Sequence, residues 1–161
     1  MKNILIVCHA NTSRSVIAEA LLKKMIEERA VGHRFRVESG GVAAYARDGA
    51  LVSMDARLVL RDEGIHLHPD HSATDLKANR YLIEEADLIL AMTRQQIDLL
   101  RQNFPEADGK EIHTLKEFAG SSGDIEDPVG KDEWVFAACR DEIKACLSTV
   151  IERLLEAGSQ E

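Results

Sequence analysis

The sequence of 161 residues has little cysteine, few aromatic residues and no long hydrophobic run. Three cysteines, an odd number, argue against the disulfide framework of a small secreted protein and favour reduced thiols in the cytoplasm. Aromatic residues make up 4% of the chain, too few for an aromatic-lined nucleic-acid surface. No apolar stretch approaches the roughly 20 residues of a membrane span, and no signal-peptide pattern follows Met1. We therefore expect a cytoplasmic protein.

Basic residues are outnumbered by acidic ones, 20 to 28, which gives a net charge of −8. Because phosphate backbones and anionic membranes attract basic patches, neither a nucleic acid nor a membrane is an expected partner. The chain is long enough to bury a core as one domain. We predict a single domain over residues 1–157 and a disordered tail over residues 158–161. Nothing in the sequence specifies an oligomeric state.

Strands and helices alternate along the chain. A continuous apolar run typical of a strand covered on both faces occurs at residues 4–7, and further strands are predicted at residues 35–39, 87–92 and 112–115. Helical spacing or capping signals mark residues 16–25, 54–63, 93–100 and 132–157, with capping-box patterns at Thr93/Gln96 and Thr114/Glu117. This alternation predicts an α/β fold with a parallel sheet. Ligands of such sheets bind beyond the carboxyl ends of the strands, which directs attention to the loop after the first strand.

That loop reads Cys8-His9-Ala10-Asn11-Thr12-Ser13-Arg14-Ser15 and leads from a strand into a helix. Backbone N–H groups that turn into a helix N-terminus favour anions, and therefore favour a thiolate over a thiol at Cys8. Arg14 is able to bind two oxygens of a tetrahedral oxyanion, and Ser15 is able to donate a hydrogen bond to the sulfur. The segment thus combines a nucleophile with a phosphate cradle. The alternative interpretation is an inert cysteine buried at a strand end.

The loop before the last helix is acidic and contains Asp124, Glu126, Asp127 and Pro128. Phosphoryl transfer to a cysteine needs an acid that protonates the leaving group. Asp127 is the candidate, because the proline after it restricts its backbone to extended conformations. An ordinary acidic turn is the alternative.

The stretches VCHANTSRS and DIEDPVG together resemble the low-molecular-weight protein-tyrosine phosphatases, and the resemblance extends over essentially the whole chain. It implies a three-layer fold in which helices flank a central four-stranded parallel sheet of order 2-1-3-4, with the phosphatase loop after the first strand. It also implies a two-step reaction without metal or cofactor, in which Cys8 is the nucleophile, Arg14 the phosphate clamp and Asp127 the general acid. The residues implied to support the loop and its thiolate are Asn11, Ser15, Ser39 and His71.

The loop departs from the family pattern at three positions. Ala10 replaces a glycine, which would strain the loop if that position needed an unusual backbone angle. Ser13 replaces the second loop cysteine, which in the family forms a protective disulfide with the nucleophile, so we expect less reversible oxidation here. Val16 replaces a proline, a change that a first helical turn tolerates.

Substrate preference depends on the pocket wall. Tyrosine-specific members carry aromatic residues after the Asp-Pro pair, where this chain has Val129 and Gly130, and a larger aliphatic residue in place of Thr12. A threonine at that position resembles the protein-arginine phosphatases of the same family, and a small polar wall suits a planar guanidinium. We favour phosphoarginine on a protein as substrate, with inorganic phosphate as product, and phosphotyrosine as the alternative. A phosphocysteine carrier or a phosphate-binding module without turnover is the alternative from another class.

Other chemistry-bearing residues are assigned structural roles. The HLHPDH segment, residues 66–71, offers histidines and a carboxylate, but no second ligand cluster, so no zinc site is predicted. Arsenate reductases share this loop and use two further cysteines in the middle of the chain. No cysteine lies between Cys8 and Cys139 here, so arsenate reduction is not the expected activity. Cys139 and Cys146 are expected in the core, and His9 at the rim of the phosphate loop.

Overall fold

A central sheet organises the protein, whose computed structural model describes residues 1–159. Four parallel strands lie in the order β2-β1-β3-β4, so the predicted α/β fold and strand order are confirmed. The strands are β1 (Lys2–Cys8), β2 (Phe35–Gly41), β3 (Leu88–Ala91) and β4 (Glu111–Thr114). Cys8 pairs with Gly41, and Val7 pairs with Ala91, so the carboxyl ends of three strands meet at one edge of the sheet.

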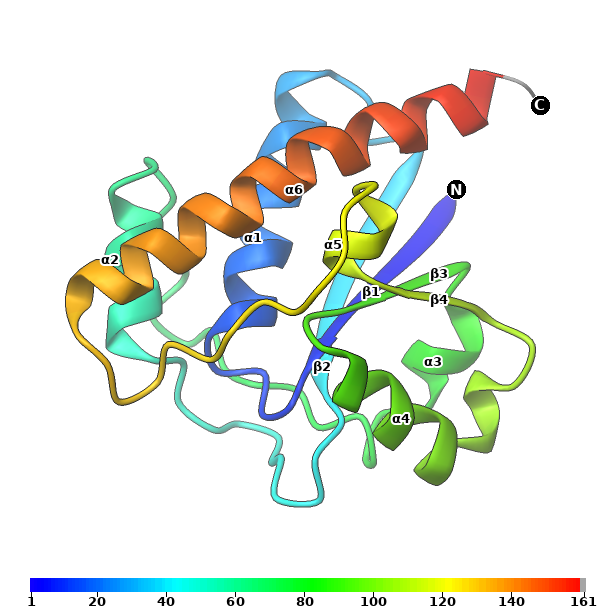
Figure 1. Ribbon diagram of the computed structural model, residues 1–161, viewed down its shortest axis with the longest axis horizontal. Helices are drawn as coiled ribbons and strands as arrows, with labels where there is room; N and C mark the ends of the chain where they lie inside the picture. The colour runs from blue at the N-terminus through cyan, green and yellow to red at the C-terminus, as the bar shows by residue number, and fades with distance from the viewer. Residues whose placement is uncertain (160–161) are drawn as a thin grey trace.

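Helices cover both faces of the sheet (Figure 1). One face packs against α1 (Arg14–Glu28), α2 (Met54–Arg61), α5 (Leu115–Phe118) and α6 (Glu133–Ser159), the other against α3 (Tyr81–Glu85), α4 (Arg94–Asn103) and η1 (Pro105–Ala107). Side chains of β1 alternate between the two cores, with Ile4 and Ile6 in one and Leu5 and Val7 in the other. Burial on both faces explains the unbroken apolar run, and each such side chain contributes about 1.5–3 kcal/mol.

Two short helical segments, α3 and η1, were not predicted from the sequence. The last helix, α6, is longer than predicted and continues to Ser159. Gly158 and Ser159 are therefore helical, and the predicted disordered tail is wrong for these two residues. Residues 160–161 of that tail lie outside the described residues. Within residues 1–159, no helix has both the length and the apolar character that crossing a membrane requires.

The loop after β1 is held tightly against the end of β2. The amides of Val42 and Ala43 donate to the carbonyls of Cys8 and His9, over 2.9 and 3.0 Å. A Cβ on Gly41 would lie 2.7 Å from the His9 carbonyl oxygen, so only glycine permits this approach. In Figure 1 this loop (blue), the cyan segment after β2 and the yellow-orange segment before α6 gather at one end of the sheet, away from the N-terminus.

Candidate active site

Asn11 gives its shape to the loop of residues 8–15, which we call the phosphate loop after the resemblance found in the sequence. Its φ of 61° is left-handed, a conformation that asparagine tolerates better than most residues. Its Oδ1 accepts from the Thr74 amide over 2.9 Å, and its Nδ2 donates to Ser15 Oγ and Ser39 Oγ over 2.7 and 2.9 Å. Every polar atom of the side chain therefore has a partner, and the segment around Thr74 and the end of β2 are tied to the loop.

Two hydrogen-bond donors face the Cys8 sulfur. The Asn11 amide lies 3.3 Å from it. Ser15 Oγ lies 2.8 Å from it, and because this oxygen already accepts from Asn11, its own hydrogen is free to donate to the sulfur. Cys8 and Ser15 are both buried. The sulfur is therefore placed to accept two hydrogen bonds at the end of β1.

The N-terminus of α1 is open toward the loop. Ser13 occupies the cap position, but its side chain makes no capping hydrogen bond, and the first turn contains no acidic residue. The buried Ser13 Oγ has no partner within the described chain. A buried helix start that lacks a cap leaves N–H groups for a ligand, and the helix dipole favours an anion there.

Arg14 connects the loop to the acidic segment before α6. It is 4% exposed, and its Nη1 donates to the Ile125 carbonyl over 2.8 Å. Its Nη2 lies 3.5 Å from His9 Nδ1 and 3.7 Å from Asp127 Oδ2. The structure thus places Asp127 beside Arg14, which lies on the same loop as Cys8, although the two loops are at opposite ends of the sequence. Arg14 Nε has no partner among residues 1–159, which leaves this donor for a phosphate oxygen.

Asp127 is open to solvent, with 55% of its side chain exposed. Its Oδ1 accepts from the Val129 amide over 3.0 Å, which orients the carboxylate. The neighbouring side chain, Val129, is 57% exposed and aliphatic. Trp134 instead lines a hollow between α2 and α6, together with Asp55 and Leu58. The residue that follows the Asp-Pro pair is therefore exposed and aliphatic.

One expectation about a supporting residue is wrong, and the condition under which Ala10 would strain the loop is not met. His71 lies outside the Asn11 network: its carbonyl accepts from Arg57 over 2.9 Å, and its side chain makes no hydrogen bond within the described chain. The backbone amide of Thr74, and not the His71 side chain, makes the hydrogen bond to Asn11. The identity of a side chain does not reveal a contact made by the backbone. Ala10 does not have a positive φ, because the left-handed residue of the loop is Asn11, so the alanine does not introduce that strain.

Three contributors to the site were not predicted from the sequence. Two act through the backbone, the Thr74 amide and the Ile125 carbonyl. The third is Gln96, which is fully buried and places its Nε2 3.0 Å from His9 Nδ1. The capping-box pattern identified Gln96 as a helix-start residue, but not as a neighbour of the phosphate loop.

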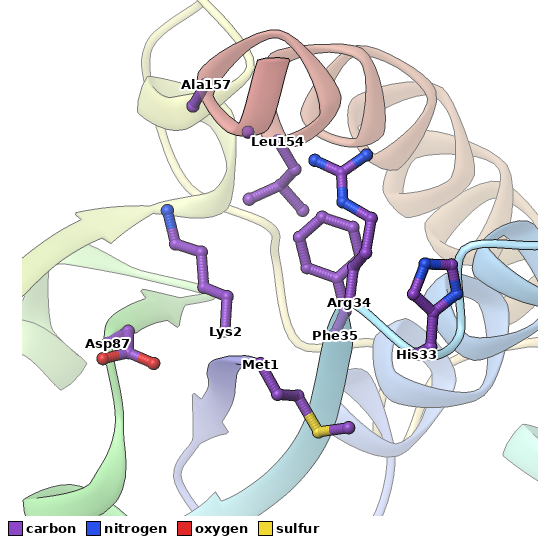
Figure 2. Close-up of a pocket in the computed structure, with 9 residues that line it drawn as sticks. Met1, Lys2, His33, Arg34, Phe35, Asp87, Leu154 and Ala157 are labelled. Atoms are coloured by element: carbon purple, nitrogen blue, oxygen red, sulfur yellow. The ribbon is translucent and has the colours of Figure 1, made fainter. Parts of the chain in front are cut away.

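Other candidate sites carry little chemistry. Among residues 1–159, no group of three or more His, Cys, Asp or Glu side chains is placed to hold a metal ion. Figure 2 shows a separate hollow at the amino ends of β1 and β2, lined by residues that include Lys2, Arg34 and Phe35. It lies at the opposite end of β1 from Cys8, roughly 20 Å away at the rise of a strand. The hollow is therefore distinct from the phosphate loop.

Comparison with known proteins identifies the class. Residues 3–160 match the family described as low molecular weight phosphotyrosine protein phosphatase. A protein-arginine-phosphatase of Geobacillus stearothermophilus is 40% identical over 154 residues, 95% of this chain and 93% of that protein. The low molecular weight protein-tyrosine-phosphatase Ptp of Acinetobacter johnsonii is 33% identical over 147 residues, 91% and 94% of the two chains. A mutant YwlE arginine phosphatase with a phosphorylated active-site serine has a TM-score of 0.88, 32% identity and 99% coverage of both chains.

The chain belongs to the low molecular weight phosphotyrosine protein phosphatase family. It is a hydrolase of this type, and the resemblance found in the sequence is confirmed. Membership favours an enzyme over a phosphocysteine carrier or a binding module. Because relatives named for arginine and for tyrosine both match, the family alone does not specify the side chain that is dephosphorylated.

Peroxide is expected to inactivate the enzyme with little recovery. Ser13 offers no thiol to an oxidised Cys8, and burial raises the pKa of the Cys139 thiol to about 11, so this second thiol is a poor partner as well. The Cys8 sulfenic acid should then proceed to sulfinic acid. Activity before and after dithiothreitol, with mass spectrometry of Cys8, measures this. The Ser13→Cys variant should recover most of its activity, whereas full recovery of the unmodified enzyme after strong peroxide would contradict the prediction.

Proposed function

We propose that this enzyme hydrolyses phosphoarginine on proteins through a phosphocysteine at Cys8. The observation that carries the proposal is the environment of the sulfur. The Asn11 amide and the Ser15 hydroxyl, 3.3 and 2.8 Å away, hold it at the open start of α1. Arg14, in the first turn of the same helix, reaches within 3.7 Å of the Asp127 carboxylate. Nucleophile, anion site and acid therefore meet in one place.

The reaction follows in two steps. Backbone N–H groups of residues 9–15 and Arg14 bind the phosphate oxygens, and the Cys8 thiolate attacks phosphorus. The bond from phosphorus to the guanidine nitrogen breaks while protonated Asp127 gives its proton to that nitrogen. The Asp127 carboxylate then takes a proton from water, whose oxygen attacks the phosphocysteine. Inorganic phosphate leaves, and the thiolate is restored.

The preference for phosphoarginine is supported by the pocket wall. Thr12 is partly exposed at the loop and is small and polar, so its hydroxyl is able to accept from a guanidine N–H. Val129 beside the acid offers no ring to stack on a phenol. The relatives at 40% and 34% identity are both named protein-arginine-phosphatase, which supports the same assignment.

Parallel measurements of phosphate release from an arginine-phosphorylated protein and a phosphotyrosine peptide test this proposal. We expect kcat/KM to favour phosphoarginine, and Cys8→Ser to release no phosphate from either. Thr12→Ile should shift the ratio toward phosphotyrosine by about tenfold or more, since one altered contact in a pocket changes discrimination by that order. Preference for phosphotyrosine would overturn the specificity and keep the mechanism, and release independent of Cys8 would overturn both.

The expected partner is a phosphorylated protein, and the expected compartment is the cytoplasm. All three cysteines are free thiols, and free thiols persist most readily in the reducing cytoplasm. We also propose that one phosphatase domain accounts for the described chain, since the family match extends over residues 3–160.

A further inference from the structure

Gln96 is held in one orientation by the backbone around it. The residue is fully buried, and its Oε1 accepts from the amides of Met92 and Thr93 over 2.9 and 3.0 Å. Since the oxygen faces these two donors, the amide nitrogen must face the other way. That nitrogen lies 3.0 Å from His9 Nδ1, and it is only able to donate. The first turn of α4 therefore presents a fixed N–H donor to the phosphate loop.

This donor determines the state of His9. An imidazole nitrogen that accepts a hydrogen bond carries no proton, so the neutral ring has its hydrogen on Nε2. The Arg14 Nη2 donor lies 3.5 Å from the same Nδ1 and shares its single lone pair with Gln96, a longer contact that is compatible with the same state. Burial and the Arg14 guanidinium lower the pKa of His9 below 6.5, while Asp127 acts in the opposite direction. His9 is therefore a neutral acceptor near pH 7.

We propose that His9 and Gln96 are positioning residues for Arg14. Gln96 holds the His9 ring as a neutral acceptor, and His9 and the Ile125 carbonyl then accept from the two terminal nitrogens of the guanidinium. With both terminal nitrogens anchored, the plane of the guanidinium is fixed while Nε stays open to phosphate. The proposal rests on the proposed function, because it assigns Arg14 to phosphate binding.

The variant Gln96→Glu directly tests the hydrogen bond between Gln96 and His9. The carboxylate still accepts from Met92 and Thr93, but it presents an oxygen to His9 Nδ1 and so favours a proton on that nitrogen. A protonated Nδ1 no longer accepts from Arg14. We expect kcat/KM at pH 7 to fall about ten- to hundredfold, as for a lost hydrogen bond to a charged group, and not to recover at alkaline pH, because the neutral ring keeps its proton on Nδ1 beside the carboxylate. Gln95→Glu, which adds the same charge at the exposed neighbouring residue, should change neither the rate nor its pH profile.

Substitutions of His9 separate the two ring nitrogens. Asparagine places an acceptor near the position of Nδ1, glutamine places a polar group near that of Nε2, and leucine has neither. We expect His9→Leu to weaken inhibition by inorganic phosphate about tenfold or more, and His9→Asn to restore most of that loss. Rescue by His9→Gln instead of His9→Asn would overturn the proposal, because it would place the function at Nε2.

The resting enzyme provides a test that needs no turnover. Nitrogen-15 NMR of the wild-type protein should show His9 with the proton on Nε2 and a pKa below 6.5, and Gln96→Glu should raise that pKa. A proton on Nδ1 of the wild-type ring near pH 7 would overturn the proposal. Since this measurement and phosphate inhibition do not depend on which substrate is hydrolysed, a failure of the positioning role is distinguishable from a failure of the proposed function.

Discussion

Cys8→Ser is expected to abolish turnover of every phosphorylated substrate, with a loss on the order of 10⁴-fold or more, as for removal of other enzymatic nucleophiles. The two donors that face the sulfur are suited to a thiolate, and at neutral pH a serine hydroxyl stays protonated in their place. Phosphate release over many turnovers, measured with phosphoarginine protein and with p-nitrophenyl phosphate, is the readout.

The same variant should also capture phosphate once. The related YwlE mutant has a phosphorylated serine in its active site, and a serine phosphate resists hydrolysis because an alkoxide leaves poorly. We therefore expect Cys8→Ser to acquire up to one phosphate per chain, on the introduced hydroxyl, with no continued release. Intact-mass analysis detects the added phosphate, and peptide mapping locates it.

Cys139→Ser is the matched control for Cys8→Ser, because it removes a second buried thiol on α6. Burial raises the pKa of this thiol to about 11, so it should take no part in the reaction, and its loss should leave turnover unchanged. Retained turnover in Cys8→Ser would contradict the phosphocysteine mechanism. Stoichiometric labelling of the wild-type protein without turnover would instead indicate a carrier.

The strands and long helices were predictable because their signals are local. Apolar runs such as Ile4 to Val7 reflect burial on both faces, and the Thr93/Gln96 capping box marks the start of α4 as the structure has it. The segment Tyr81–Glu85 was missed because it is five residues long and begins without a side-chain cap. The tail was misjudged because Gly158 remains helical at the end of α6.

The site residues that lie close together in the sequence were predictable, whereas contacts between distant segments were not. Cys8, Arg14 and Ser15 lie on one loop, and their spacing points to an anion site. That Asp127 lies beside Arg14 depends on packing at the carboxyl edge of the sheet. The Asp-Pro pair made Asp127 the candidate acid, and the family resemblance implied the same role. The His71 prediction failed because a backbone amide, that of Thr74, provides the contact. Gln96 was recognised for its capping oxygen, while its amide nitrogen reaches His9 only in the folded chain.

Asp127→Asn is expected to slow hydrolysis of phosphoarginine or phosphotyrosine by about 10²- to 10⁴-fold, the usual contribution of a general acid. Asparagine retains the hydrogen bond from the Val129 amide, because its Oδ1 is also an acceptor, so the loop should keep its shape. What it lacks is an exchangeable acidic proton. The loss should therefore appear in the step that expels the guanidine or the phenol.

Leaving-group dependence separates this role from a structural one. The p-nitrophenolate ion departs without a proton, so with p-nitrophenyl phosphate the first step should slow much less than with the natural substrates. Glu126→Gln, a charge removal at the exposed neighbouring side chain, should affect neither substrate. Equal losses on both substrates in the first step would instead indicate that Asp127 acts on Arg14, whose Nη2 it approaches to 3.7 Å.

Because the same carboxylate activates water in the second step, the Asp127→Asn variant should also accumulate phosphocysteine. Rapid acid quenching and mass analysis of Cys8 would detect this intermediate.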